Sequence, residues 1–209
     1  MKRPNTSVAD RIMRRARAAG RGSVFTPRDF LHIAGRAAVD QALSRLVKIG
    51  KLRRLAHGLY NFAKVHPKLG LLSPVPDDVA LALARETGSQ VQVAPARAAH
   101  ALGLTTQVPA RSTYLTDGPS RRVVLGKRVI DLRHTSPKHL LAPGTPIGTV
   151  VQALRHVGLA RAVEVVDLAA AHLSSADKKR LAASIVDAPA WMRKTLASIV
   201  NSAEAGVNG

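Results

Sequence analysis

The 209-residue chain has no cysteine, and this absence removes several kinds of chemistry. A disulfide framework, a thiolate zinc site and a cysteine nucleophile are all excluded. Apolar runs are short, and none approaches the roughly 18 consecutive residues that a membrane span needs. The basic N-terminus also lacks the apolar stretch of a secretory signal. We therefore expect a cytoplasmic protein with no membrane partner.

Catalytic motifs are missing as well. Gly126-Lys127-Arg128 has the lysine of a phosphate-binding loop, but it lacks the glycine before it and the Ser or Thr after it, so a hairpin turn is the better interpretation. No Gly-x-Ser-x-Gly elbow is present. His134 and His139 have no clustered carboxylates beside them and are interpreted as solvated loop residues. The sequence thus predicts no enzyme, no catalytic residue, no metal site and no cofactor.

Acidic residues are scarce. The 13 Asp and Glu stand against 32 Lys and Arg, which gives a net charge of +19 and a pI near 11.6. The first 70 residues hold eleven arginines and five lysines against three aspartates, so they carry +13 of this charge. Such asymmetry is typical of a nucleic-acid-binding segment. A merely solubilising basic surface is the alternative, but it does not require charges at groove-reading positions.

Helical spacing predicts three helices in the first 50 residues. Ser7 is expected to cap the first helix. Thr26 followed by Pro27 is typical of a helix start and predicts a second helix through Ile33. The third helix is expected over residues 37–49, with an apolar face and a polar, cationic face.

A β-hairpin is predicted directly after these helices. Two short apolar runs, 52–55 and 59–62, flank the loop Ala56-His57-Gly58. Three helices followed by a hairpin form the winged helix-turn-helix arrangement. Its third helix would be about 20 Å long and would fit a major groove about 12 Å wide.

The polar face of the third helix contains the residues expected to read bases. Arg36 and Arg45 can bond guanine with both arms of their guanidinium groups, Gln41 can do the same for adenine, and Ser44 can bond either base. The alternative for each residue is a solvated helix face. Their number, together with the +13 charge, favours double-stranded DNA as the partner.

Other cations are placed to contact the DNA backbone. Lys48, Arg53 and Arg54 lie where the helix end and the hairpin would meet phosphates, and they would supply salt-dependent affinity. Thr26 and Arg28 begin the second helix, and helix N-termini favour anions.

The rest of the chain predicts a second domain. Residues 66–76 are interpreted as a connection, so the expected domains are a winged helix-turn-helix over 1–70 and an α+β regulatory domain over 77–209. The second domain is expected to contain a helix, a short strand, another helix, an antiparallel meander and terminal helices, at 77–88, 91–93, 95–102, 112–132, 149–157, 160–173, 176–186 and 190–201. The predicted fold class is α+β.

Several segments resemble the AbiEi-type antitoxins of type IV toxin–antitoxin systems. The matching segments are Gly22-Ser23-Val24-Phe25-Thr26-Pro27-Arg28-Asp29-Phe30, Val39 to Gly50, Leu52-Arg53-Arg54, His57-Gly58-Leu59-Tyr60 and Tyr114-Leu115-Thr116-Asp117-Gly118-Pro119. The final helices, about 161–202, match no motif of that family.

The resemblance implies a bacterial repressor that binds inverted repeats in its own promoter, in association with the nucleoid. It also implies a functional link to a separate nucleotidyltransferase-like toxin. It extends the DNA-binding role to Thr26, Arg28, Arg36, Gln41, Ser44, Arg45, Arg53, Arg54 and His57. Two other hypotheses stay open: an interaction module that docks an acidic protein, and a nucleic-acid-processing enzyme with unrecognised catalytic residues.

Overall fold

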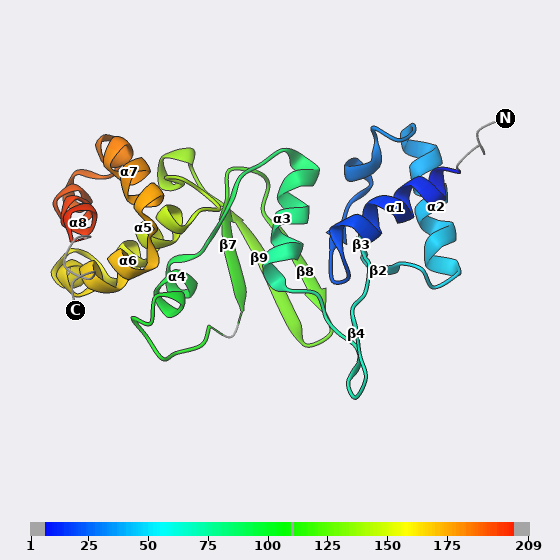
Figure 1. Ribbon diagram of the computed structural model, residues 1–209, viewed down its shortest axis with the longest axis horizontal. Helices are drawn as coiled ribbons and strands as arrows, with labels where there is room; N and C mark the ends of the chain where they lie inside the picture. Colours follow the sequence, from blue (N-terminus) through cyan, green and yellow to red (C-terminus); the bar gives the residue numbers. More distant parts are fainter. Residues whose placement is uncertain (1–6, 110, 203–209) are drawn as a thin grey trace. The chain divides into compact units, whose positions relative to one another are not determined.

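Figure 1 shows the computed structural model, which describes residues 7–109 and 111–202. The architecture is mixed α+β with small sheets, in agreement with the predicted class. The chain forms two compact units. The first contains the described residues up to Ser89 together with Arg121–Ile130, and the second contains those of Gln90–Ser120 and those from Asp131 onward.

The first unit begins with the predicted helices and hairpin. Its elements are α1 (Val8–Ala19), β1 (Val24–Phe25), the 3-10 turn η1 (Pro27–Phe30), α2 (Arg36–Lys48), β2 (Arg53–Ala56) and β3 (Leu59–Asn61). The Ser7 hydroxyl accepts a hydrogen bond from the Asp10 amide at 3.2 Å, which confirms the predicted cap. The three strands form an antiparallel sheet in the order β1-β3-β2. Apolar side chains of α1, η1 and α2 pack together above it.

The second predicted helix is wrong in type and length. Only the 3-10 turn η1 forms, and the amides of Leu31 and Ile33 bond back three residues to Arg28 and Phe30. Phe30 is fully buried, and its ring centroid lies 5.4 Å from that of Phe25. Burying this aromatic pair so close to the start of α2 favours a tight turn over a longer helix, so tertiary packing outweighs the local helical pattern.

The predicted connection over 66–76 is structured. It contains a two-stranded hairpin, β4 (Val65–His66) and β5 (Gly70–Leu71), and leads into α3 (Pro76–Thr87). α3 packs against β1 and η1 and belongs to the first unit. The first compact unit therefore extends beyond the boundary expected at residue 70, because the apolar face of α3 is buried there.

The strands of the second sheet do not form a simple meander. They are β6 (Val91–Val93), β7 (Ser112–Thr116), β8 (Arg121–Leu125) and β9 (Arg128–His134), in the order β6-β7-β9-β8. In a meander β8 would lie between its chain neighbours, whereas β9 holds the central position here. The tight turn at Gly126, which has φ +61°, folds β9 back along β8. The division between the two units passes through β9.

Helices form the core of the second unit. They are α4 (Pro95–Ala101), η2 (Pro137–His139), α5 (Pro146–Val157), η3 (Leu159–Val165), α6 (Val166–His172), α7 (Ser175–Ser184), η4 (Ile185–Asp187) and α8 (Ala190–Asn201). Buried apolar side chains from α4, α5, α6, α7 and α8 make one continuous cluster. The helix predicted over 160–173 is divided into η3 and α6.

Gly148 in α5 offers a test of this packing. A Cβ atom at this position would lie 2.5 Å from the Ala142 carbonyl oxygen and 2.5 Å from the Gln92 side-chain oxygen. We expect Gly148→Ala to lower the free energy of unfolding by about 1–3 kcal/mol, as overpacking does, although alanine ordinarily favours a helix interior. Urea unfolding followed by circular dichroism measures the change.

Gly35→Ala is the control, because it adds the same methyl group where no atom lies within 4 Å. A Gly148→Ala protein as stable as the parent would contradict the close approach of these segments.

Candidate nucleic-acid interface

α2 separates an apolar face from a cationic face. Val39 and Leu43 are fully buried, and Leu46 is nearly so. The opposite face exposes Gln41, Ser44, Arg45 and Lys48. Positions three, four and seven residues apart share one side of a helix, so these four side chains form a single surface on a 13-residue helix. No hydrogen bond or ion pair joins any of the four to another described residue.

Arg36 does not belong to this surface. It lies five residues before Gln41, which at 3.6 residues per turn places it roughly 140° around the helix. Its guanidinium Nε donates to the Asp40 carboxylate at 2.8 Å. Both side chains of this pair are exposed, so the pair has little effect on stability. The structure thus separates Arg36 from the other residues predicted to read bases.

Thr26 and Arg28 have structural roles instead of the predicted phosphate contacts. Thr26 is completely buried, and its backbone N–H donates to the Asp29 carboxylate at 2.8 Å. The Arg28 guanidinium donates to the Glu86 carbonyl at 2.7 Å and lies beside Gly88 at the end of α3. A buried hydroxyl and a guanidinium bonded within the unit are not free to receive a phosphate.

The two arginines of β2 lie on opposite sides of the strand. Arg53 is half-buried and donates to the Asn61 side chain and to the Leu72 carbonyl, each at 2.9 Å. Arg54 is exposed, with its guanidinium 3.3 Å from the His57 ring. Arg54 and His57 therefore stay on the surface near the β2–β3 turn, whereas most of the hydrogen bonding of Arg53 is internal.

Asn61 is a central residue that the sequence analysis did not single out. It is almost fully buried, and its side-chain amide donates to the carbonyls of Gly22 and Ser23 at 2.9 and 3.0 Å. Its side-chain oxygen accepts from Arg53. An asparagine between the apolar residues Tyr60 and Phe62 was the available signal, because a polar group within an apolar strand needs a buried partner.

A groove of about 450 Å³ lies beside β2. Four basic residues line it, namely Arg21, Lys51, Arg53 and Arg54, with apolar residues between them. Arg21 is fixed there by a 3.1 Å hydrogen bond to the Ala63 carbonyl and by stacking over the Phe62 ring at 4.9 Å. Arg21 and Lys51 were not among the predicted site residues.

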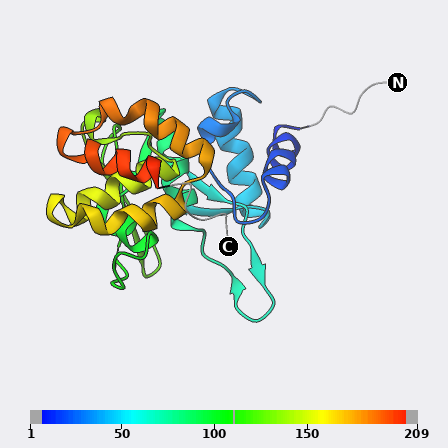
Figure 2. The same cartoon turned by 60° about the vertical axis from the view of Figure 1, so that its left-hand side comes forward.

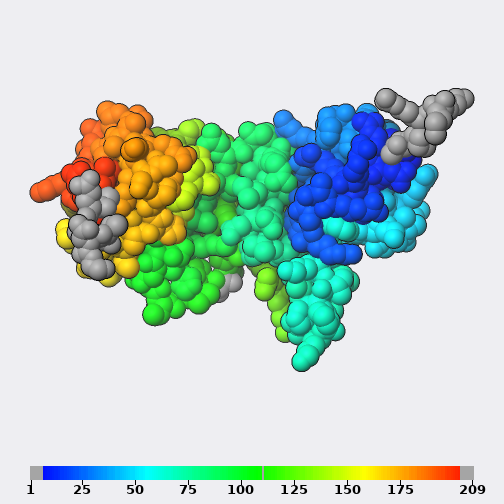
Figure 3. Space-filling view, in the orientation of Figure 1, coloured from blue at the N-terminus to red at the C-terminus, as the bar shows by residue number. Residues whose placement is uncertain are grey.

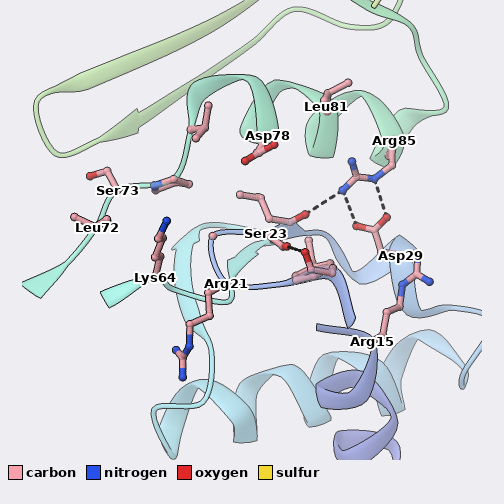
Figure 4. A pocket seen from close by; sticks show the side chains of 16 residues that line it. Arg15, Arg21, Ser23, Asp29, Lys64, Leu72, Ser73, Asp78, Leu81 and Arg85 are labelled. Carbon is pink, nitrogen blue, oxygen red and sulfur yellow. Dashed lines mark hydrogen bonds and ion pairs between the residues drawn. The ribbon is translucent and has the colours of Figure 1, made fainter. Parts of the chain in front are cut away.

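A larger hollow of about 660 Å³ in the same unit is lined by charges of both signs (Figure 4). Arg85 of α3 donates to the Asp29 carboxylate at 3.0 Å and to the Val24 carbonyl at 3.0 Å. Burial raises the pKa of Asp78, and the nearby Asp77 carboxylate acts in the same direction, while Arg85 opposes both. The hydrogen bonds of Arg85 hold α3 against β1 and η1.

The predicted loop histidines of the second unit both contact oxygen atoms. The His134 ring nitrogen Nδ1 lies 2.9 Å from the Gly118 carbonyl oxygen, and that of His139 lies 3.1 Å from the Thr135 hydroxyl. Burial lowers the pKa of His139, and the neighbouring Arg155 and Lys138 add to this effect. Within residues 7–109 and 111–202, no three potential ligands are grouped to hold a metal. None of the described helices has the length and apolar character needed to cross a bilayer.

Comparison with known proteins assigns the chain to a family. Residues 11–184 match the model of DUF6088, a family of unknown function, and the chain belongs to that family. No curated protein matches it. Among solved structures, the chain is similar to the RV2827C protein from Mycobacterium tuberculosis, with 21% identity over 94% of this chain and 77% of the other, and a TM-score of 0.42. The family has no described activity, so function has to be inferred from the site.

The structural role of Thr26 can be tested directly. We expect Thr26→Ala to lower the free energy of unfolding by about 0.5–2 kcal/mol, because the variant lacks the residue that begins a helical turn. Thermal unfolding measures this change, with the exposed Thr106→Ala as control. The salt dependence of DNA binding by the folded variant should match that of the parent. A reduced salt dependence with unchanged stability would restore Thr26 as a phosphate contact.

Proposed function

We propose that this protein is a sequence-specific double-stranded DNA-binding repressor and that its first unit is a winged helix-turn-helix. The order α1, β1, η1, α2, β2, β3 and the sheet order β1-β3-β2 support this interpretation. The observation that carries the proposal is the surface of α2 formed by Gln41, Ser44, Arg45 and Lys48. It is exposed and has no partner among the described residues.

The chemistry of this surface suits a base-reading role. Arg45 can donate two hydrogen bonds to a guanine edge, and Gln41 can both donate to and accept from adenine. Lys48, at the end of the helix, can neutralise a phosphate. The acidic residue of α2, Asp40, is bonded to Arg36 and so contributes little repulsion. A helix of 13 residues, about 20 Å long, fits lengthwise in a major groove.

The β2–β3 hairpin supplies a second contact in this proposal. Arg54 and His57 are exposed near its turn, where a backbone phosphate can approach them. Such contacts add affinity without reading sequence, and they weaken as salt concentration rises. Arg53 supports the hairpin from behind and takes part in DNA binding mainly by positioning it.

We further propose that the protein is the autoregulating antitoxin of a type IV system, acting against a nucleotidyltransferase-like toxin. This proposal rests on the resemblance of residues 22–30, 39–50 and 52–60 to that family. The operator would then be inverted repeats in its own promoter. A gene for such a toxin next to the gene for this chain supports the proposal, and an unrelated neighbour weakens it.

The first experiment is a mobility-shift titration on the DNA upstream of the protein's own gene. A random duplex of equal length is the competitor, and two salt concentrations are used. Selective binding that persists at higher salt supports the repressor. Equal and salt-labile binding to both duplexes contradicts it and favours docking to an acidic protein partner.

Arg45→Ala tests the recognition surface. We expect it to weaken binding to the specific site by about 1–3 kcal/mol and to reduce discrimination against the random duplex. Lys194→Ala, which removes one exposed charge from α8, is the matched control and should bind as the parent does. Arg36→Ala should have a smaller effect than Arg45→Ala, because Arg36 lies on another side of α2. Undiminished binding by Arg45→Ala would show that α2 is not the reading helix.

A further inference from the structure

The β4–β5 hairpin of the first unit is exposed along its length, and the views in Figure 2 and Figure 3 show it extending away from α1 and α2. Val65, Leu69 and Leu71 are 57%, 73% and 60% exposed. A two-stranded hairpin is marginally stable alone in water, and exposed aliphatic side chains in one place mark interaction surfaces. The hairpin therefore calls for a partner.

Hydrogen bonds hold the hairpin in a defined position. At its base, the Leu72 amide donates to the Lys64 carbonyl, and Arg53 of β2 donates to the Leu72 carbonyl, each at 2.9 Å. At its tip, the His66 ring nitrogen accepts from the amides of Lys68 and Leu69, each at 3.2 Å. The hairpin is thus fixed to β2, the strand that also carries Arg54.

Charge indicates the kind of partner. No Asp or Glu occurs between Asp40 and Asp77. This stretch includes the second half of α2, both hairpins and seven basic residues, namely Arg45, Lys48, Lys51, Arg53, Arg54, Lys64 and Lys68. Two copies of such a hairpin would repel each other if they met, whereas a polyanion would be attracted. Nucleic acid is therefore favoured over a second copy of the chain.

The groove beside β2 has the composition that a sugar–phosphate strand requires. Lys51, Arg53 and Arg54 provide positive charge on one side, and Val65 and Leu71 of the hairpin line it with apolar surface. Arg53 Nε is buried and has no hydrogen-bond partner among the described residues. Phosphates need the charged groups, and deoxyribose can pack against the apolar ones.

We propose that one DNA backbone strand lies in this groove and that the β4–β5 hairpin crosses it to reach the adjoining minor groove. The proposal rests on the DNA-binding function proposed above. Lys64 and Lys68 would contact phosphates on the far side of the strand, and Leu69 at the tip would pack at the edge of the minor groove. Proteins that bind the minor groove combine cations with apolar side chains in this way.

The test compares two double variants of the full chain. In Lys64→Gln/Lys68→Gln, the slope of log affinity against log salt should become shallower by about 1 for each phosphate that the variant no longer neutralises, on both a random duplex and the promoter fragment. Lys179→Gln/Lys194→Gln removes the same charge from exposed positions of α7 and α8 and should leave the slope unchanged. Equal slopes for the two variants would overturn the proposal.

Hydroxyl-radical footprinting separates this proposal from the parent one. On the promoter fragment, the hairpin variant should lose protection at the flanking backbone positions and keep the central protection, while Arg45→Ala should weaken the whole footprint. Central protection with flanks unchanged in the hairpin variant refutes the hairpin contact alone. No footprint by the parent protein refutes the DNA-binding function itself.

Sedimentation of Leu69→Ser/Leu71→Ser addresses the competing occupant. The proposal expects the same sedimentation as the parent. A change from an oligomer to a smaller species would assign the hairpin to a subunit contact and overturn the proposal.

Discussion

The buried side chain of Asn61 is the point on which the first unit depends. It bonds to the carbonyls of Gly22 and Ser23 before β1 and accepts from Arg53 of β2. Arg53 in turn holds the Leu72 carbonyl at the base of the β4–β5 hairpin. A buried polar network is rigid when its members are paired and costly when they are not, so it allows one arrangement of these segments. The cationic surfaces of the unit are positioned by this arrangement.

The strong positive charge imposes a second constraint. A net +13 in the first 70 residues opposes compaction through repulsion between like charges. The unit relieves part of this repulsion with carboxylates placed away from the exposed α2 surface, since Arg85 pairs with Asp29 and Arg121 with Glu86. Arg45 and Lys48 have no such partner among the described residues. The uncompensated charge is thus concentrated on α2 and the neighbouring hairpins, where a polyanion can supply the missing counter-charge.

Local sequence predicted much of the first unit and less of the second. The periodicity of Val39, Leu43 and Leu46 predicted α2 within a residue of its observed bounds, because an amphipathic helix follows from residues that are near one another in the chain. The loop at Gly58 predicted the β2–β3 turn for the same reason. The order β6-β7-β9-β8 could not be predicted, because strand pairing depends on contacts between distant segments. The length of η1 was missed because the burial of Phe30 against Phe25 decided it.

The sequence by itself determined the α+β class, the charge asymmetry and the cationic face of α2, since these depend on composition and on helical period. Tertiary structure decided which cations remain free. Arg28 and Arg53 resemble Arg45 and Arg54 in the sequence, yet their guanidinium groups bond to Glu86 and Leu72, far along the chain. Thr26, predicted to be a surface contact, is buried at the start of η1. A side chain's partners are set by the three-dimensional proximity of distant residues, and no local pattern encodes that proximity.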